Sequence, residues 1–142
     1  MATDRTRAAE ALKARTKRFA VRIVKMFRAL PKTPEARILG RQVVRSGTSV
    51  AANYRAACRA RSKAEFTSKI HIVLEEIDET VLWLEMLVDC DIVAPSRMTG
   101  LTAEARELLA IFGATWRTAK TRTNADGKRS SMLDDQSNDR PT

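Results

Sequence analysis

The sequence predicts an all-α protein, an antiparallel up-down-up-down four-helix bundle, and three observations support that fold class. Apolar residues recur at three- and four-residue steps over four long segments, which is the spacing of one helix face. The chain has only 5 glycines and 4 prolines in 142 residues, fewer than the tight turns of an all-β protein require. The connections between the segments are short, so consecutive helices should run in opposite directions.

The first helix is predicted over about residues 4–30. Pro31 and Pro34 end it, because proline lacks an amide hydrogen and disfavours helix at the residue before it. The expected core face of this helix comprises Leu12, Phe19, Ile23, Met26, Phe27 and Leu30.

The second helix is predicted over about residues 34–60, with Thr33 as its N-cap and Pro34 at its first position. Gly40 and Gly47 lie inside it, and each costs about 1 kcal/mol relative to alanine. Either the helix breaks at Ser46-Gly47, or it is continuous and its small residues allow a neighbour to approach closely; we favour the continuous helix. The expected core face comprises Leu39, Val43, Val44, Val50, Ala51, Tyr54 and Cys58.

The third helix, about residues 62–91, opens with a capping box from Ser62 to Glu65. Its apolar stripe comprises Phe66, Ile70, Val73, Leu74, Ile77, Val81, Leu84 and Val88. The fourth helix, about residues 95–120, repeats the pattern with Met98, Leu101, Ala105, Leu108, Phe112 and Trp116. Residues 1–122 should therefore form one bundle domain, and the polar residues 123–142 a disordered tail.

The net charge of +9 is unevenly distributed along the chain. Residues 1–32 carry ten basic and two acidic groups, and residues 33–64 carry seven and one. The third helix reverses this balance, with eight acidic groups and one basic group in residues 65–93. Such a distribution indicates either self-complementary surfaces or a basic face for a polyanion.

Several classes of protein are disfavoured by the sequence. No run of about 18 apolar residues could span a membrane, and the basic N-terminus lacks the apolar core of a signal peptide. Cys58 and Cys90 should lie too far apart for an intramolecular disulfide, which fits a reducing compartment. We therefore expect a cytoplasmic protein with no membrane partner.

No catalytic or metal-binding pattern stands out. His71 is the only histidine and has no second ligand one helical turn away. Ser49 lies in a near miss of the hydrolase nucleophile motif, but in the middle of a predicted helix. The acidic run from Glu75 to Glu79 is best explained as a charged exterior. We predict no enzyme activity, no metal and no cofactor.

A second apolar face on the third helix suggests a contact with another copy of the chain. Ile72, Trp83 and Met86 should project nearly opposite to the core stripe, beside Glu65, Glu76 and Glu79. An aromatic residue with apolar neighbours on an outer face often marks an interface, although scattered surface apolar residues are the alternative. The three glutamates would then meet Arg37 and Arg41 of an adjoining chain, which closes head-to-tail into a ring.

Two arginine-rich stripes form the candidate nucleic-acid surface. They comprise Arg15, Arg18, Arg22 and Lys25 on the first helix, and Arg37, Arg41, Arg55 and Arg59 on the second. Arginine binds phosphate through forked hydrogen bonds and counterion release, so RNA or DNA is the favoured partner. Subunit pairing, an acidic protein partner and a simple solvated face are the alternatives. Binding to a membrane surface would need a free apolar face, which the bundle core should occupy.

Two segments resemble the four-helix-bundle proteins first named after intervening sequences in 23S rRNA genes. The family pattern is similar at Ser49, at Ala52-Asn53 and from Ser62 to Phe66, and again over residues 72–87. The chain departs from it after Asn53, where many members read Ile-Ala-Glu-Gly and this chain reads Tyr-Arg-Ala-Ala. The resemblance implies a cytoplasmic bacterial bundle that forms ring-like homopentamers. A related branch resembles accessory proteins of diversity-generating retroelements, which bind nucleic acid and a reverse transcriptase.

Overall fold

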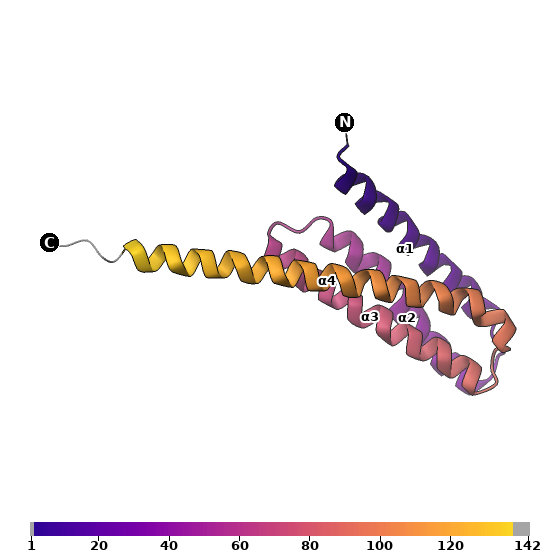
Figure 1. Ribbon diagram of the computed structural model, residues 1–142. Coiled ribbons are helices and arrows are strands. Elements are labelled where there is room, and N and C mark those ends of the chain that lie inside the picture. Colours follow the sequence, from indigo (N-terminus) through magenta and orange to yellow (C-terminus); the bar gives the residue numbers. More distant parts are fainter. Residues whose placement is uncertain (1, 138–142) are drawn as a thin grey trace.

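The computed structural model describes residues 2–137, and all regular secondary structure in this part of the chain is helical. The four helices are α1 (Asp4–Arg28), α2 (Pro34–Ala57), α3 (Lys63–Asp89) and α4 (Pro95–Ser137). Each helix packs against the next along the chain, whereas α1 and α4 share only a small contact. Figure 1 shows the α1–α2 and α3–α4 connections at one end of the molecule and the α2–α3 connection at the other. None of the described helices is long and apolar enough to cross a membrane.

Side-chain caps start the helices where the sequence predicts them. Thr33 Oγ1 accepts a hydrogen bond from the amide of Ala36 at 3.3 Å, with Pro34 in the first turn of α2. Ser62 Oγ accepts from the amide of Glu65 at 3.1 Å, and Glu65 Oε2 accepts from the amide of Arg61 at 3.1 Å. Both caps occupy amides that the helix leaves free, so they fix the first residues of α2 and α3.

The core lies along the axis of the bundle and is built from the predicted apolar faces. Tyr54 of α2 and Phe112 of α4 meet with ring centroids 5.3 Å apart. Leu74 was expected in this core but is only half-buried at its edge, beside the fully buried Ile77. The largest fully buried side chains are Phe19, Ile23, Ile70, Ile77, Leu84, Leu87, Met98, Leu108 and Phe112.

Helix α2 is continuous through Ser46-Gly47, so the alternative of a break there is wrong. The glycines instead permit close packing of α1. A Cβ on Gly40 would lie 2.7 Å from the ring of Phe27, and one on Gly47 would lie 3.0 Å from Ile23. The buried Ser46 hydroxyl accepts a hydrogen bond from Thr80 of α3 at 2.8 Å, which satisfies both groups inside the bundle.

Helix α4 is much longer than the sequence suggested. We expected it to end near residue 120 and residues 123–142 to be disordered, yet the helix runs on to Ser137 (Figure 1). No proline interrupts residues 121–137, and most of these residues tolerate helix. The first turns of the extension contact α3, through Thr67–Thr123 at 3.0 Å and Lys63–Asp126 at 2.7 Å. Residues 138–142 of the expected tail lie outside the described part.

Candidate nucleic-acid interface

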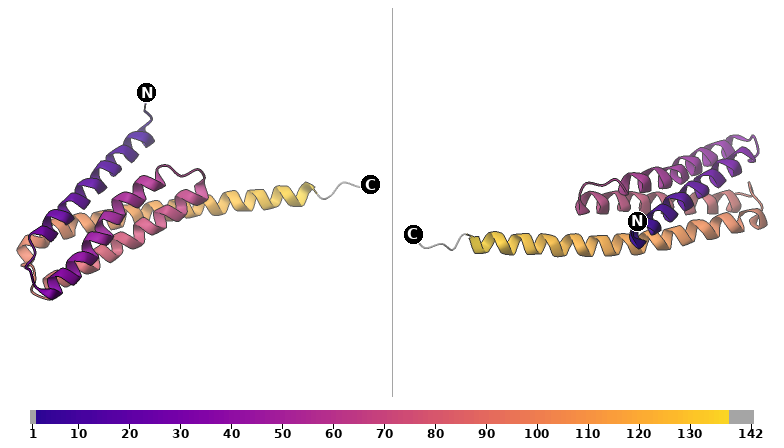
Figure 2. Two further views of the ribbon diagram at one scale, coloured as in Figure 1. Left: turned by 180° about the vertical axis from the view of Figure 1, so that it is seen from behind. Right: turned by 90° about the horizontal axis from the view of Figure 1, so that it is seen from above.

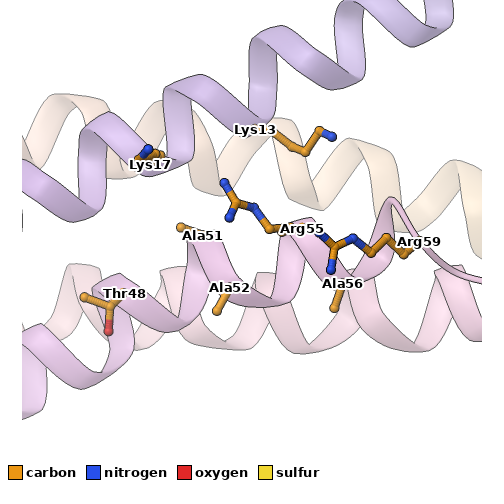
Figure 3. Close-up of a pocket in the computed structure, with 8 residues that line it drawn as sticks. All are labelled: Lys13, Lys17, Thr48, Ala51, Ala52, Arg55, Ala56 and Arg59. Atoms are coloured by element: carbon orange, nitrogen blue, oxygen red, sulfur yellow. The ribbon is translucent and has the colours of Figure 1, made fainter.

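The N-terminal half of α1 diverges from the other helices, as Figure 1 and the left view of Figure 2 show. Between this half and α2 lies an open groove with a volume of about 410 Å³. Figure 3 shows Lys13 and Lys17 on α1 at one side of the groove, and Arg55, which points toward α1, on α2 at the other side. The lining residues are Lys13, Lys17, Thr48, Ala51, Ala52, Arg55, Ala56 and Arg59, and we call this hollow the α1/α2 groove.

Both walls of the α1/α2 groove are positively charged. Within residues 2–137, Lys17, Arg55 and Arg59 form no ion pair. Lys13, which is partly buried, pairs with the exposed Glu10 one turn earlier on α1, at 2.5 Å. Glu10 offsets only one of the four positive charges, so the groove keeps a strongly positive character.

Small residues of α2 also line the groove. Ala51, Ala52 and Ala56 line it from α2, and the Thr48 hydroxyl donates to the carbonyl of Val44 at 2.7 Å in its own helix. Alanine side chains leave the space between the cations open, and the lining contains no aromatic ring. An anionic group can therefore approach the four cations closely, while no platform for base stacking is present among the lining residues.

Arg15 does not belong to the free basic surface, contrary to the sequence-based prediction. Its guanidinium forms two hydrogen bonds to Glu104 of α4, at 3.1 and 2.6 Å, and one to Glu107 at 2.8 Å. Hydrogen bonding to Arg15 lowers the pKa of Glu104, and the positive charges of Arg15, Arg22 and Arg18 act in the same direction. Arg15 therefore links α1 to α4 on the flank of α1 that faces away from the groove.

The other seven predicted cations are exposed and form no ion pair within the described residues. They divide between two surfaces, because those of α1 lie on its α4 side, and those of α2 and of the turn after it lie on the groove side. The first group comprises Arg18, Arg22 and Lys25, and the second comprises Arg37, Arg41, Arg55 and Arg59. The structure thus brings Arg55 and Arg59 to the groove but leaves the α1 stripe on a different face.

Sequence reasoning missed Lys13 and Lys17, the two cations that α1 contributes to the groove. They lie one turn apart and therefore share a helix face, which is a detectable signal. This face continues through Val21 and Val24, both exposed, so it does not have the appearance of a basic stripe. Only the packing of α1 on α2 shows that the two lysines lie opposite Arg55 and Arg59.

The predicted oligomer face of α3 is largely engaged within the chain. Arg45 of α2 forms an ion pair with Glu76 at 3.3 Å and another with Glu79. Both glutamates are therefore already paired with an arginine of their own chain. Glu65 caps its own helix, as described above. These side chains were expected on a free outer surface, but α2 packs close enough to reach them.

The apolar residues of the same face are less exposed than predicted. Trp83 and Met86 are half-buried and contact the core, and Trp83 Nε1 donates to Glu79 Oε1 at 3.3 Å. Ile72 is also half-buried. The expectation that all three side chains face water is therefore wrong, although each keeps part of its surface accessible.

The groups with catalytic potential serve structural contacts. The ring of His71 stacks on Trp116 with centroids 5.1 Å apart and lies 3.3 Å from Glu75. Ser49 lies within α2, where its hydroxyl accepts from Asn53 at 3.3 Å. In the described part of the chain, no group of three or more His, Cys, Asp or Glu residues could hold a metal ion. Cys58 and Cys90 are both free thiols.

Comparison with known proteins places most of the chain in a family context. Residues 11–114 match the family model described as 23S rRNA-intervening sequence protein. The chain is also similar to a crystal structure from Bacteroides thetaiotaomicron, described as a protein of unknown function from the S23 ribosomal protein family. The two are 32% identical with a TM-score of 0.69, over 73% of this chain and 96% of that one. No curated protein matches the chain.

Proposed function

This chain belongs to the 23S rRNA-intervening sequence protein family, and we propose that it is a non-catalytic helical module that presents a basic surface to RNA or DNA. In this proposal the chain is an antiparallel bundle that assembles into a ring of identical subunits. The nucleic acid then binds to the assembled ring as part of a larger complex.

One observation carries the nucleic-acid part of the proposal. Seven of the eight predicted cations have no carboxylate partner among the described residues, whereas the glutamates of α3 and α4 are largely paired. The ion pairs join Arg45 to Glu76 and Glu79, Arg15 to Glu104 and Glu107, and Arg106 to Glu85. The positive charge that remains on α1 and α2 lies on two surfaces, the α4 side of α1 and the groove side of α2, and such unpaired cations favour the binding of a polyanion.

The assembly part of the proposal rests on the partly accessible apolar residues of α2 and α3. Ile38 of α2 is 63% exposed, and Ile72, Trp83 and Met86 of α3 are half-buried. A second subunit that covered them would remove apolar surface from water, at about 25 cal/mol per Å². The internal ion pairs of Arg45 would lie within such an interface and need not be broken.

The test is the binding of labelled 30-nucleotide RNA and DNA to the purified protein, followed by fluorescence anisotropy at several salt concentrations. We expect binding at about 50 mM salt that weakens steeply and linearly on a log–log plot, since phosphate contacts release counterions. Replacing both Arg37 and Arg41 by alanine should weaken binding. The matched control replaces Arg97 and Arg122, exposed and unpaired cations of α4, and should leave affinity unchanged.

A protein that binds neither nucleic acid at low salt is not a nucleic-acid module. If it instead bound an acidic peptide through Arg37 and Arg41, the same basic surface would serve a protein–protein adaptor. Equal losses in the α2 variant and in the α4 control would mean that binding follows net charge and has no defined surface.

A further inference from the structure

We propose that the α1/α2 groove holds one strand of nucleic acid by its phosphodiester backbone, without reading its bases. This inference rests on the proposed function and adds to it the place of binding, the strandedness of the ligand and the group that is recognised.

The four positive charges at the groove favour the binding of an anion between its walls. Lys13 and Lys17 approach from α1, Arg55 approaches from α2, and Arg59 approaches from the turn that follows α2 (Figure 3). Like charges on facing walls repel one another, and they do so more strongly beside protein than in bulk water. Glu10 is the one carboxylate paired with any of the four among the described residues, and it lies on the solvent-exposed surface of α1. An anionic group in the groove would interact favourably with both walls at once.

The size of the groove favours a single strand over a duplex. A volume of about 410 Å³ falls within the range of roughly 300–1,000 Å³ that is typical of small-ligand sites. It accommodates the sugar-phosphate unit of one or two nucleotides, whereas a duplex, whose major groove alone is about 12 Å wide, could touch only the rim. The small alanine side chains among the lining residues leave room for a backbone.

The chemistry of the lining favours recognition of phosphate over recognition of bases. Single-stranded nucleic acid is usually held by basic groups together with aromatic rings on which bases stack. The groove has four basic side chains and no aromatic ring. Its hydroxyl group, that of Thr48, already donates to Val44. Binding should therefore be independent of sequence, and the bases should face solvent.

Further cations along α2 indicate a polymer and not a free nucleotide. Arg41 and Arg55 lie on the same face of α2, about 21 Å apart at 1.5 Å per residue. Arg37 lies one turn beyond Arg41, and both are exposed and unpaired in the described part of the chain. A strand that leaves the groove along α2 would meet these arginines next, which a mononucleotide could not reach.

The test compares a groove variant, Lys17→Ala with Arg55→Ala, with the α4 control variant Arg97→Ala with Arg122→Ala. The ligands are labelled 12-nucleotide single strands of dT and of U, and a duplex of equal length. All four substituted side chains are exposed, so circular dichroism should report unchanged helix content. The groove variant should bind both single strands at least tenfold more weakly at about 50 mM salt. Its slope of log affinity against log salt should be flatter by about 1.4, from two lost contacts at about 0.7 each.

The outcomes separate this inference from the proposed function. If the wild type binds nucleic acid but the groove variant behaves like the α4 control, the groove is not the site and the proposed function stands. If the wild type binds no nucleic acid, both are overturned. Duplex binding that is tighter than single-strand binding and equally sensitive to Lys17 and Arg55 overturns the assignment to a single strand. Inorganic polyphosphate should compete with the strand; a failure to compete would show that sugars or bases are read.

Discussion

At the scale of single residues, the ion pairs decide which of the many basic side chains are available to a partner. Arg15 and Arg18 are neighbours on the same stripe of the sequence, yet Arg15 is bound to α4 and Arg18 is not. The Glu104 side chain is only 18% exposed, whereas that of Glu107 is 71% exposed. The link between α1 and α4 therefore depends chiefly on Glu104, because burial strengthens an ion pair that is well hydrogen-bonded.

Replacing Glu104 by glutamine should lower the free energy of unfolding at pH 7 by about 1 kcal/mol. The pKa of Glu104 is lowered in the folded chain, so its contribution is present at neutral pH and is lost as the pH falls through that pKa. Thermal unfolding of wild type and variant at pH 7 and at pH 3 measures the effect, and the difference should shrink at pH 3. Glu107→Gln is the matched control and should have the smaller effect at pH 7. A Glu104 effect that is independent of pH would contradict this account.

At the scale of the helices, the contact of α1 with α2 depends on residues without side chains. Gly47 faces the fully buried Ile23, whose Cγ1 and Cγ2 would lie 3.0 and 3.1 Å from an added Cβ. Ile23 is β-branched and held on all sides, so it has little freedom to yield. Gly113 of α4 is different, because its nearest neighbours would be the flexible end of Arg117 at 3.4 Å and Leu74 at 3.9 Å.

Gly47→Ala is therefore expected to destabilise the protein, although alanine is the better helix former by about 1 kcal/mol. Overpacking a core costs about 1–3 kcal/mol, so the net loss should be about 1 kcal/mol. Gly113→Ala should be neutral or stabilising by up to about 1 kcal/mol. Denaturant unfolding of the two variants measures the contrast, and a stabilising Gly47→Ala would show that α1 can move away from α2.

The end of α4 is helical but makes few contacts. Its residues 124–135 are exposed, and its Lys63–Asp126 ion pair is too accessible to contribute much. Deleting residues from 124 onward should therefore shift the thermal midpoint by less than about 2 °C. A deletion from residue 113 onward also removes Trp116 and the buried Ala119, and should lower the midpoint strongly. Equal shifts for both deletions would mean that the end of α4 packs against something in solution.

The same elements show what the sequence can predict. Periodic apolar residues identified the helices, and local capping signals placed the starts of α2 and α3, because both depend on neighbours within one or two turns. The groove could not be predicted, because Lys13 and Arg55 line the same hollow only as a result of how α1 packs on α2. The pairing of Arg15 with Glu104 spans 89 positions and leaves no local signal. The length of α4 does not follow from apolar periodicity, because its last turns are polar and exposed yet still helical.

At the scale of the whole molecule, assembly and nucleic-acid binding would use different sides of the bundle. The groove lies between α1 and α2, whereas the partly accessible apolar residues lie on α2 and α3. A subunit contact over α2 and α3 would therefore leave the groove open. In a ring, one groove per subunit would be repeated around the assembly, and a long strand could engage several of them at once.

Ile72→Glu should reduce the mass of the assembly measured by light scattering, because it places a charge in the proposed subunit contact. Ile72 is a better site for the substitution than Trp83. The Trp83 side chain contacts the core, so replacing it could change folding as well as assembly. Met132→Glu is the control, since Met132 is 66% exposed on the end of α4, outside the bundle. Both variants should keep their helix content. A wild-type monomer, or an Ile72→Glu variant of unchanged mass, would rule out this subunit contact.

The divergence of α1 from the bundle also affects how fast its amide hydrogens exchange with solvent. Residues 4–8 of α1 are exposed, whereas Phe19 and Ile23 in its second half are fully buried. Amide hydrogens in the first turns should exchange with deuterium through local fraying, without unfolding of the molecule. Those near Ile23 should exchange only when the entire bundle opens. Protection from hydrogen exchange should therefore rise along α1 from almost none to that of the whole bundle. A ligand that bridges α1 and α2 would slow exchange most in the N-terminal turns of α1.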